Sequence, residues 1–62
     1  MLNLNDVVTV IGRSAEIGII TYGQNKTEAA RLEASDGDYY IVQFEKGLEV
    51  LREDQLQKQQ MQ

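Results

Sequence analysis

The residues best suited to acid–base chemistry are the two aspartates of Asp36-Gly37-Asp38. Carboxylates at this spacing lie on the same side of a strand, where they can serve as a general acid and a general base. The same residues match part of a calcium-binding loop, but the further ligand positions and the bidentate glutamate are missing. Because aspartate stabilises tight turns by hydrogen bonding to its own backbone, we interpret Asp36 and Asp38 as turn residues.

The other candidates for chemistry lack the groups that would activate them. Ser14 and Ser35 have no histidine to act as a base, since the chain contains none, so nucleophilic catalysis of the usual kind is not expected. Gly12-Arg13-Ser14 lacks the glycine spacing and the terminal lysine of a phosphate loop. Without cysteine or histidine, an ordinary zinc site is excluded. The sequence therefore predicts a protein that is not an enzyme, with no catalytic residue, metal site or cofactor.

The chain is short and acidic. A domain of 62 residues buries only about 60% of its unfolded surface. Such a core rarely contributes more than about 3–5 kcal/mol, so association with itself or with a larger partner would stabilise it. The charges of residues 1–31 cancel, and the whole net charge of −4 arises in residues 32–62. An acidic half of this kind repels phosphate backbones and favours basic partner surfaces.

The first six residues are not expected to form a secretory signal peptide. Met1–Asp6 has neither the basic region nor the apolar stretch of a secretory signal peptide. No apolar run reaches the length needed to cross a bilayer, and the absence of cysteine fits a reducing compartment best. We therefore expect a cytoplasmic protein that does not insert into a membrane.

Several segments have the composition of β-strands. Val7–Ile11 is rich in β-branched residues, which favour a pleated and half-buried strand. Gly12 and Gly18 flank a polar connection, Arg13–Ile17, and we expect both glycines to supply backbone freedom for a turn. The expected strands are Val7–Ile11, Ile17–Tyr22, Ala29–Ser35, Tyr39–Phe44 and Leu48–Leu51.

Residues 27–34 are compatible with either a helix or a strand. Glu28–Glu33 consists of good helix formers, and a preceding asparagine or threonine would cap a short helix. Asp36-Gly37, however, is a strong signal for a two-residue hairpin turn, because both residues tolerate a positive φ. Such a turn needs a strand before it, so we favour an extended conformation for Ala29–Ser35.

The alternation along Tyr39–Phe44 divides its side chains between two faces. We place Tyr40, Val42 and Phe44 in the core and Tyr39, Ile41 and Gln43 on the opposite face. Strands joined by short turns, with little helix, predict a small barrel. Arg52–Leu56 is predicted to form a short helical turn that inserts Leu56 into an open end of this barrel. The alternative is a single helix over Glu53–Met61. The expected domain is residues 1–56, and the polar residues 57–62 are expected to form a flexible tail.

Two parts of the chain resemble known families. Asp6-x-Val8-x-Val10-x-Gly12, followed by Gly18-x-Ile20, resembles the opening of KOW motifs in SH3-like domains of ribosome- and transcription-associated proteins. Tyr40–Glu45, followed by Glu53–Leu56, resembles the ferredoxin-docking accessory subunits of photosystem I and of the photosynthetic NDH complex. The resemblance lies in apolar spacing over residues 6–22 and 39–56. It implies an all-β fold, a small SH3-like barrel of about five antiparallel strands with a short helical turn near the C-terminus.

Outward-facing aromatic and basic residues are the candidates for contact with a partner, because aromatic side chains dominate interface energetics. Tyr39 is expected to face outward beside Ile41, or alternatively to cover part of a distorted core with it. We predict a non-catalytic protein-interaction or accessory subunit that binds a protein partner or forms a homo-oligomer. The predicted partner-binding residues are Tyr22, Tyr39, Ile41, Arg13 and Arg31.

Two other functions are weighed against this prediction. The first is a nucleic-acid- or ribosome-associated KOW-type barrel, which the net charge of −4 disfavours. The second is a catalytic pore formed by a tetramer of barrels, as in plasmid-type dihydrofolate reductases. Ile41–Phe44 is distantly similar to the strand that lines such a pore, but the alternating Val-Gln-Ile-Tyr motif of that strand is absent.

Overall fold

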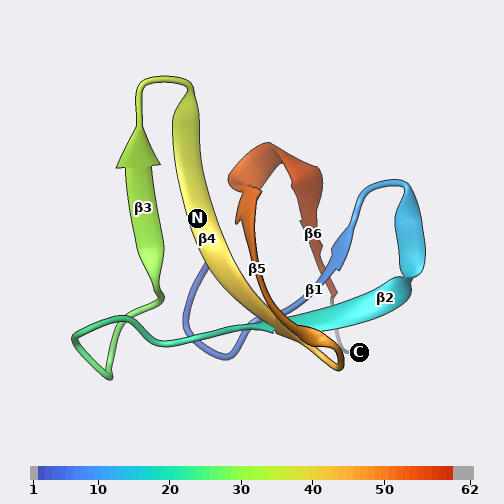
Figure 1. Cartoon of the computed structure of the whole chain (residues 1–62), viewed down its shortest axis with the longest axis horizontal. Coiled ribbons are helices and arrows are strands. Elements are labelled where there is room, and N and C mark those ends of the chain that lie inside the picture. The colour runs from blue at the N-terminus through green and yellow to red at the C-terminus, as the bar shows by residue number, and fades with distance from the viewer. Residues whose placement is uncertain (1, 60–62) are drawn as a thin grey trace.

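The structure, a computed structural model, describes residues 2–59 apart from the side chains of residues 14 and 15, and this part of the chain is built from antiparallel β-strands (Figure 1). The prediction of an all-β fold with a short helical turn near the C-terminus is confirmed, with one strand more than expected. The elements are β1 (Val7–Val10), β2 (Arg13–Ile20), β3 (Arg31–Ala34), β4 (Gly37–Phe44), β5 (Gly47–Arg52), the 3-10 turn η1 (Glu53–Gln55) and β6 (Leu56–Lys58).

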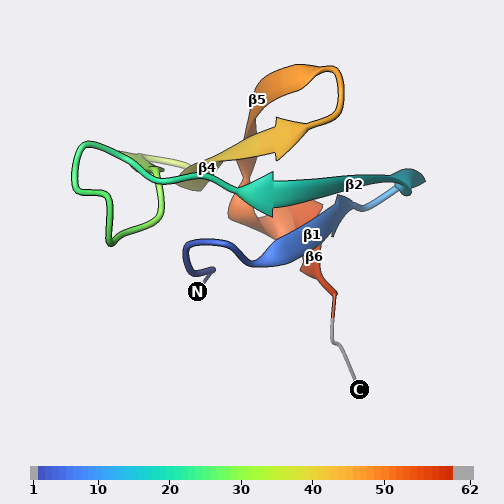
Figure 2. The same ribbon diagram turned by 90° about the horizontal axis from the view of Figure 1, so that it is seen from below.

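Strand β4 is the centre of the sheet, because other strands pair along both of its edges. The strand order is β3-β4-β2-β1-β6, and β5 also pairs with β4. On one edge, β3 pairs with residues 37–40 of β4 and β2 pairs with Val42 and Gln43. On the other edge, β5 runs along residues 39–44. Figures 1 and 2 show the sheet curling, so that β5 and η1 lead back to β6 beside β1.

The core is formed by the inward faces of these strands. Tyr40 and Val42 are fully buried and Phe44 is 9% exposed, so the predicted inward face of β4 is confirmed. The Tyr40 hydroxyl accepts a hydrogen bond from the Leu2 N–H at 3.3 Å, which satisfies its polar end. The core cluster is Val8, Val10, Ile20, Tyr40, Val42, Phe44, Leu51 and Leu56.

The polar segment Arg13–Ile17 belongs to β2, and its predicted role as a connection is wrong. The turn lies at Ile11 and Gly12, where Gly12 has a φ of +89°, and Val10 pairs directly with Arg13. Polar residues are compatible with this strand because one face of an antiparallel sheet can meet solvent.

Gly18 is an interior residue of β2, and its predicted role in a turn is also wrong. A Cβ atom at this position would lie 2.4 Å from Val42 Cγ1 and 2.8 Å from Phe44 Cε1. Both distances are too short for real carbon contacts, so a side chain here would collide with the inward face of β4. Gly18 therefore serves close packing between β2 and β4.

The ambiguous segment before the hairpin is extended, as we favoured, over Arg31–Ala34. The hairpin loop consists of Ser35 and Asp36, one residue earlier than predicted, because Ala34 pairs with Gly37. Gly37 is the first residue of β4 and has a φ of +133°, a conformation that glycine adopts most easily.

The expected tail is wrong for its first two residues. Gln57 and Lys58 belong to β6, which pairs with β1 through Val8 and Lys58 at one end and Val10 and Leu56 at the other. The free edge of β1 provides the backbone partners that hold this polar segment. Leu56 packs into the core directly after η1, as predicted, so one helix from Glu53 onward is excluded. Residues 60–62 of the expected tail lie outside the described residues.

We predict that Gly18→Ala destabilises the protein by about 1–3 kcal/mol, because the added methyl group overpacks the contact with Val42 and Phe44. Urea unfolding followed by circular dichroism measures the effect. Gly23→Ala is the matched control, since a Cβ there meets its nearest atom, Ala30 Cα, only at 3.4 Å. Equal stability of the two variants would contradict the packing role of Gly18.

Candidate protein interface

The structure does not bring the predicted partner-binding residues into one site. Tyr39 and Ile41 share the outer face of β4, where both are partly buried. Tyr22 is 58% exposed and lies beyond the end of β2, paired with Ala29 in an isolated bridge. Arg13 begins β2 and Arg31 begins β3, two strands that do not pair with each other and that lie on opposite sides in Figure 1.

Both predicted arginines are engaged in ion pairs with carboxylates of the same chain. Arg13 lies 3.3 Å from Glu16 and 3.0 Å from Glu49, which joins β2 to β5. Arg31 lies 2.9 Å from Glu33 and 3.9 Å from Asp38. The charge of Asp38 is the main reason that the pKa of Arg31 is raised. These cations are therefore partly neutralised before any partner arrives.

The two aspartates singled out for acid–base chemistry bind different arginines. Asp36 lies in the hairpin loop, as predicted, and its Oδ2 is 3.5 Å from Arg52. Asp38 is a strand residue of β4 instead of a turn residue, and it faces Arg31. Each carboxylate is thus placed for an ion pair with a neighbouring strand.

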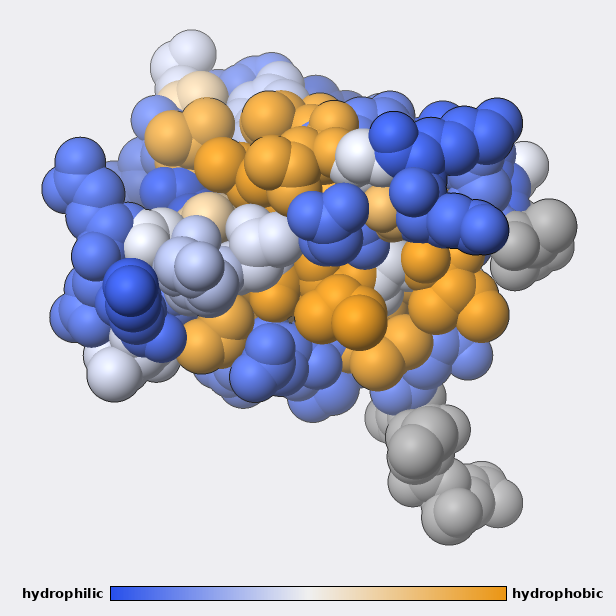
Figure 3. Space-filling model, turned by 60° about the horizontal axis from the view of Figure 1, so that its bottom comes forward, coloured by the Kyte–Doolittle hydropathy of each residue, from blue (hydrophilic) through white to orange (hydrophobic). Residues whose placement is uncertain are grey.

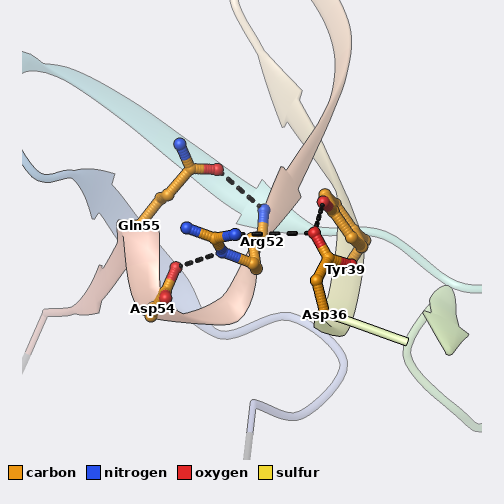
Figure 4. A network of polar contacts seen from close by, with 5 residues as sticks. All are labelled: Asp36, Tyr39, Arg52, Asp54 and Gln55. Carbon is orange, nitrogen blue, oxygen red and sulfur yellow. Dashed lines mark hydrogen bonds and ion pairs between the residues drawn. The ribbon is translucent and has the colours of Figure 1, made fainter. Parts of the chain in front are cut away.

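Tyr39 is part of a polar network that ties the β3–β4 hairpin to η1 (Figure 4). Its hydroxyl donates to Asp36 Oδ2 at 2.7 Å. Arg52 binds Asp36 on one side and Asp54 on the other, with Nε 2.7 Å from Asp54 Oδ1. The Arg52 backbone N–H donates to Gln55 Oε1 at 3.0 Å, closing the turn. Tyr39 therefore joins parts of the same chain, and its hydroxyl already donates a hydrogen bond within it.

This network shifts the pKa values of three of its residues, one downward and two upward. The hydrogen bond from Tyr39 is the largest cause that lowers the pKa of Asp36, with the charge of Arg52 acting in the same direction. The same hydrogen bond raises the pKa of Tyr39, because the ionised phenolate would face a carboxylate. The pKa of Arg52 is raised by its hydrogen bond to Asp54.

An outer apolar face forms where β2, β4 and β5 lie side by side. Pairing places Ile19 opposite Gln43 and Gln43 opposite Leu48, while Ile41 lies opposite Val50. Leu48 is 64% exposed, and Ile17 and Val50 are at least half exposed. Figure 3 brings this side forward and shows hydrophobic side chains gathered across it. The outer apolar face consists of Ile17, Ile19, Ile41, Leu48 and Val50.

Only Ile41 of this face was predicted to bind a partner. Ile17 and Ile19 belong to the expected strand Ile17–Tyr22, for which we predict no inward or outward face, and Leu48 and Val50 alternate with Glu49 and Leu51. That alternation was the available signal, because period-two spacing divides a strand between core and surface. It could not show which outward residues of different strands become neighbours.

A groove of about 550 Å³ lies between β2 and the β4–β5 hairpin and shares Ile17 and Leu48 with the outer apolar face. Ile17, Phe44 and Leu48 supply its apolar lining, and Glu16, Glu45 and Glu49 supply carboxylates. We call this the acidic groove; its full lining is Glu16, Ile17, Phe44, Glu45, Lys46, Gly47, Leu48 and Glu49.

Comparisons with protein-family models, curated proteins and solved structures give no match. Among the residues that the structure describes, no three carboxylates gather closely enough to hold a metal ion. No helix within residues 2–59 is long and apolar enough to cross a membrane.

We predict that Tyr39→Phe raises the pKa of Asp36 toward its ordinary value of about 4, because the donated hydrogen bond is lost. NMR titration of the carboxyl carbons measures this directly. Tyr22→Phe is the control, since it removes a phenol hydroxyl outside the network. An unchanged Asp36 pKa in Tyr39→Phe would contradict the assigned cause.

The same contact gives the protein a defined window of pH stability. Because the pKa of Asp36 is lowered on folding, its contribution is complete above about pH 4 and is lost as the pH falls through the folded value. The pKa of Tyr39 is raised on folding, so its contribution is complete below about pH 10 and is lost as the pH rises through the folded value. The difference in thermal stability between wild type and Tyr39→Phe should be full between about pH 4 and about pH 10. It should shrink as the pH falls through the folded pKa of Asp36 or rises through that of Tyr39.

Proposed function

We propose that this protein is a non-catalytic protein-interaction module, an accessory subunit of a larger complex. Its partner is a protein segment that carries aliphatic side chains next to lysine or arginine. The observation that carries the proposal is the continuity between the outer apolar face and the acidic groove, since Ile17 and Leu48 belong to both.

The apolar part of this surface supplies the driving force for association. Leu48 and Ile17 are each more than 60% exposed, and removing such area from water contributes about 25 cal/mol per Å². Contiguous exposed apolar area rimmed by polar residues is typical of interaction sites.

The carboxylates of the groove select the charge of the partner. Glu16 and Glu49 share one cation, Arg13, and Glu45 lies in the lining together with Lys46, so the carboxylates outnumber these cations and leave the groove negative. A net charge of −4 also steers basic segments toward the protein. An acidic segment would meet repulsion at the same rim, so the groove favours cations.

The strand order supports placing the module among SH3-like barrels. β1 pairs with both β2 and the last strand, β4 pairs with β2 and β5, and a 3-10 turn connects the last two strands. Together with the apolar spacing of residues 6–22 and 39–56, this order favours an SH3-like barrel in which β3 is an additional strand. We also propose that the protein is cytoplasmic.

The alternative function is binding to a nucleic acid, which the charge distribution disfavours. Arg13, Arg31 and Arg52 each contact two carboxylates, and Lys58 lies 3.5 Å from Asp6. Binding to a phosphate backbone depends on cationic side chains that can replace counterions, and these four side chains are already paired with carboxylates of the chain itself.

We predict that a display library of random peptides yields binders in which leucine, isoleucine or valine lies next to lysine or arginine. Leu48→Asn should weaken these peptides about tenfold or more, because it removes a central apolar contact of the groove. Glu45→Lys should weaken them in the same direction by reversing one charge of the rim. Isothermal titration calorimetry with a selected peptide measures both.

Ile11→Asn is the matched control, because Ile11 is 63% exposed, nearly the same as Leu48, yet lies in the β1–β2 turn outside the groove. Peptide binding should survive this change. A failure to select any peptide, or equal binding to Leu48→Asn and wild type, would overturn the proposal. A salt-dependent RNA mobility shift that is lost in Arg13→Ala and Arg31→Ala would establish the nucleic-acid rival in its place.

A further inference from the structure

Strand β3 has a free edge. It pairs with β4 on one side and is the end strand of the described sheet (Figure 1). All of its residues, Arg31, Leu32, Glu33 and Ala34, are exposed. An unpaired edge presents backbone donors and acceptors that another strand can bind, and proteins commonly cover such edges or place charges on them.

The register with β4 determines which residues of β3 direct their backbone groups toward this edge. The Ile41 N–H donates to the Ala30 carbonyl at 3.1 Å, in line with the pairing of Leu32 with Tyr39 and Ala34 with Gly37. Hydrogen-bonded pairs alternate along an antiparallel ladder. Leu32 and Ala34 therefore direct their backbone groups at β4, whereas Arg31 and Glu33 direct theirs at the free edge.

We propose that two copies of this chain pair through their β3 edges, antiparallel and with Leu32 opposite Leu32 of the second copy. In this register Arg31 exchanges backbone hydrogen bonds with Glu33 of the second copy, and Glu33 does so with Arg31 of that copy. These are the residues whose backbone groups are available, so the alternation of the ladder is satisfied. The sheet then continues through both molecules.

The side chains select this register over its neighbours. Within one chain Arg31 already lies 2.9 Å from Glu33. The register adds Glu33 of the second copy directly across from Arg31 at both ends of the contact, and opposite charges in facing positions are favourable in a sheet. Leu32, 51% exposed, meets its counterpart in a non-hydrogen-bonded pair, where facing side chains are closest. A symmetric register centred on Arg31 or on Glu33 would place like charges opposite each other.

The second copy is the occupant that this edge fits best, because a strand with one cation and one anion in alternate positions is complementary to itself. A segment so short buries less area than a standard interface, so the dimer should be weak. Sedimentation equilibrium tests this from about 10 µM to about 1 mM, the concentration range in which a weak dimer becomes populated. Wild type should change from monomer to dimer within this range.

Charge reversal tests the register. Arg31→Glu carries two anions on the edge and Glu33→Arg carries two cations, so each alone should dimerise about tenfold or more weakly than wild type. An equimolar mixture of the two variants restores both opposite-charge pairs and should form a heterodimer. Lys26→Glu and Glu28→Arg are matched controls, because they change the net charge equally outside β3 and should leave dimerisation unchanged.

Hydrogen exchange provides a readout that does not depend on the variants. The amides of Arg31 and Glu33 should become more protected as wild-type concentration rises, whereas those of Leu32 and Ala34 should be protected at all concentrations. Circular dichroism establishes that each variant is folded. Monomeric wild type at about 1 mM, concentration-independent exchange at Arg31 and Glu33, or a folded variant mixture that stays monomeric would each overturn the proposal. Leu48→Asn should still dimerise, so failure of the peptide-binding proposal and failure of this one are distinguishable.

Discussion

The close approach of β2 to β4 at Gly18 is the contact on which the rest of the structure depends. Val42 and Phe44 occupy the space where a side chain at residue 18 would lie, so any larger residue there would force these side chains to shift. Through this contact β4 joins β3 and β5 to the β1–β2 pair. The inward face of β4 can then pack against Val8 and Ile20, both fully buried, which completes the core of a short chain.

Arginine contributes to the fold by joining elements that are distant in sequence. Arg13 connects β2 to Glu49 of β5, and Arg52 connects the β3–β4 loop to η1. These pairs are exposed, and isolated exposed pairs contribute little on their own. The ion pair between Arg52 and Asp36 is reinforced by Tyr39, whose hydroxyl donates a hydrogen bond that holds Asp36 in place. The chain thus uses its arginines internally and presents a predominantly acidic exterior.

The surface offers two contacts of different chemistry. The acidic groove is lined by both apolar side chains and carboxylates, which is the basis for the proposed basic partner segment. The free edge of β3 is polar and made of backbone groups, which favours another strand. Because the groove lies beside β2 and the β4–β5 hairpin while β3 is at the other end of β4, the two proposed contacts do not overlap.

The sequence alone determined the all-β fold, the inward face of Tyr40, Val42 and Phe44, and the helical turn before Leu56, because alternation, β-branched content and turn residues are local signals. Tertiary structure decided what depends on neighbours distant in sequence. The free edge of β1 draws Gln57 and Lys58 into β6, and the packing of β4 makes Gly18 a contact residue instead of a turn. Likewise, pairing of three strands assembles the outer apolar face, while the two predicted arginines begin different strands, β2 and β3.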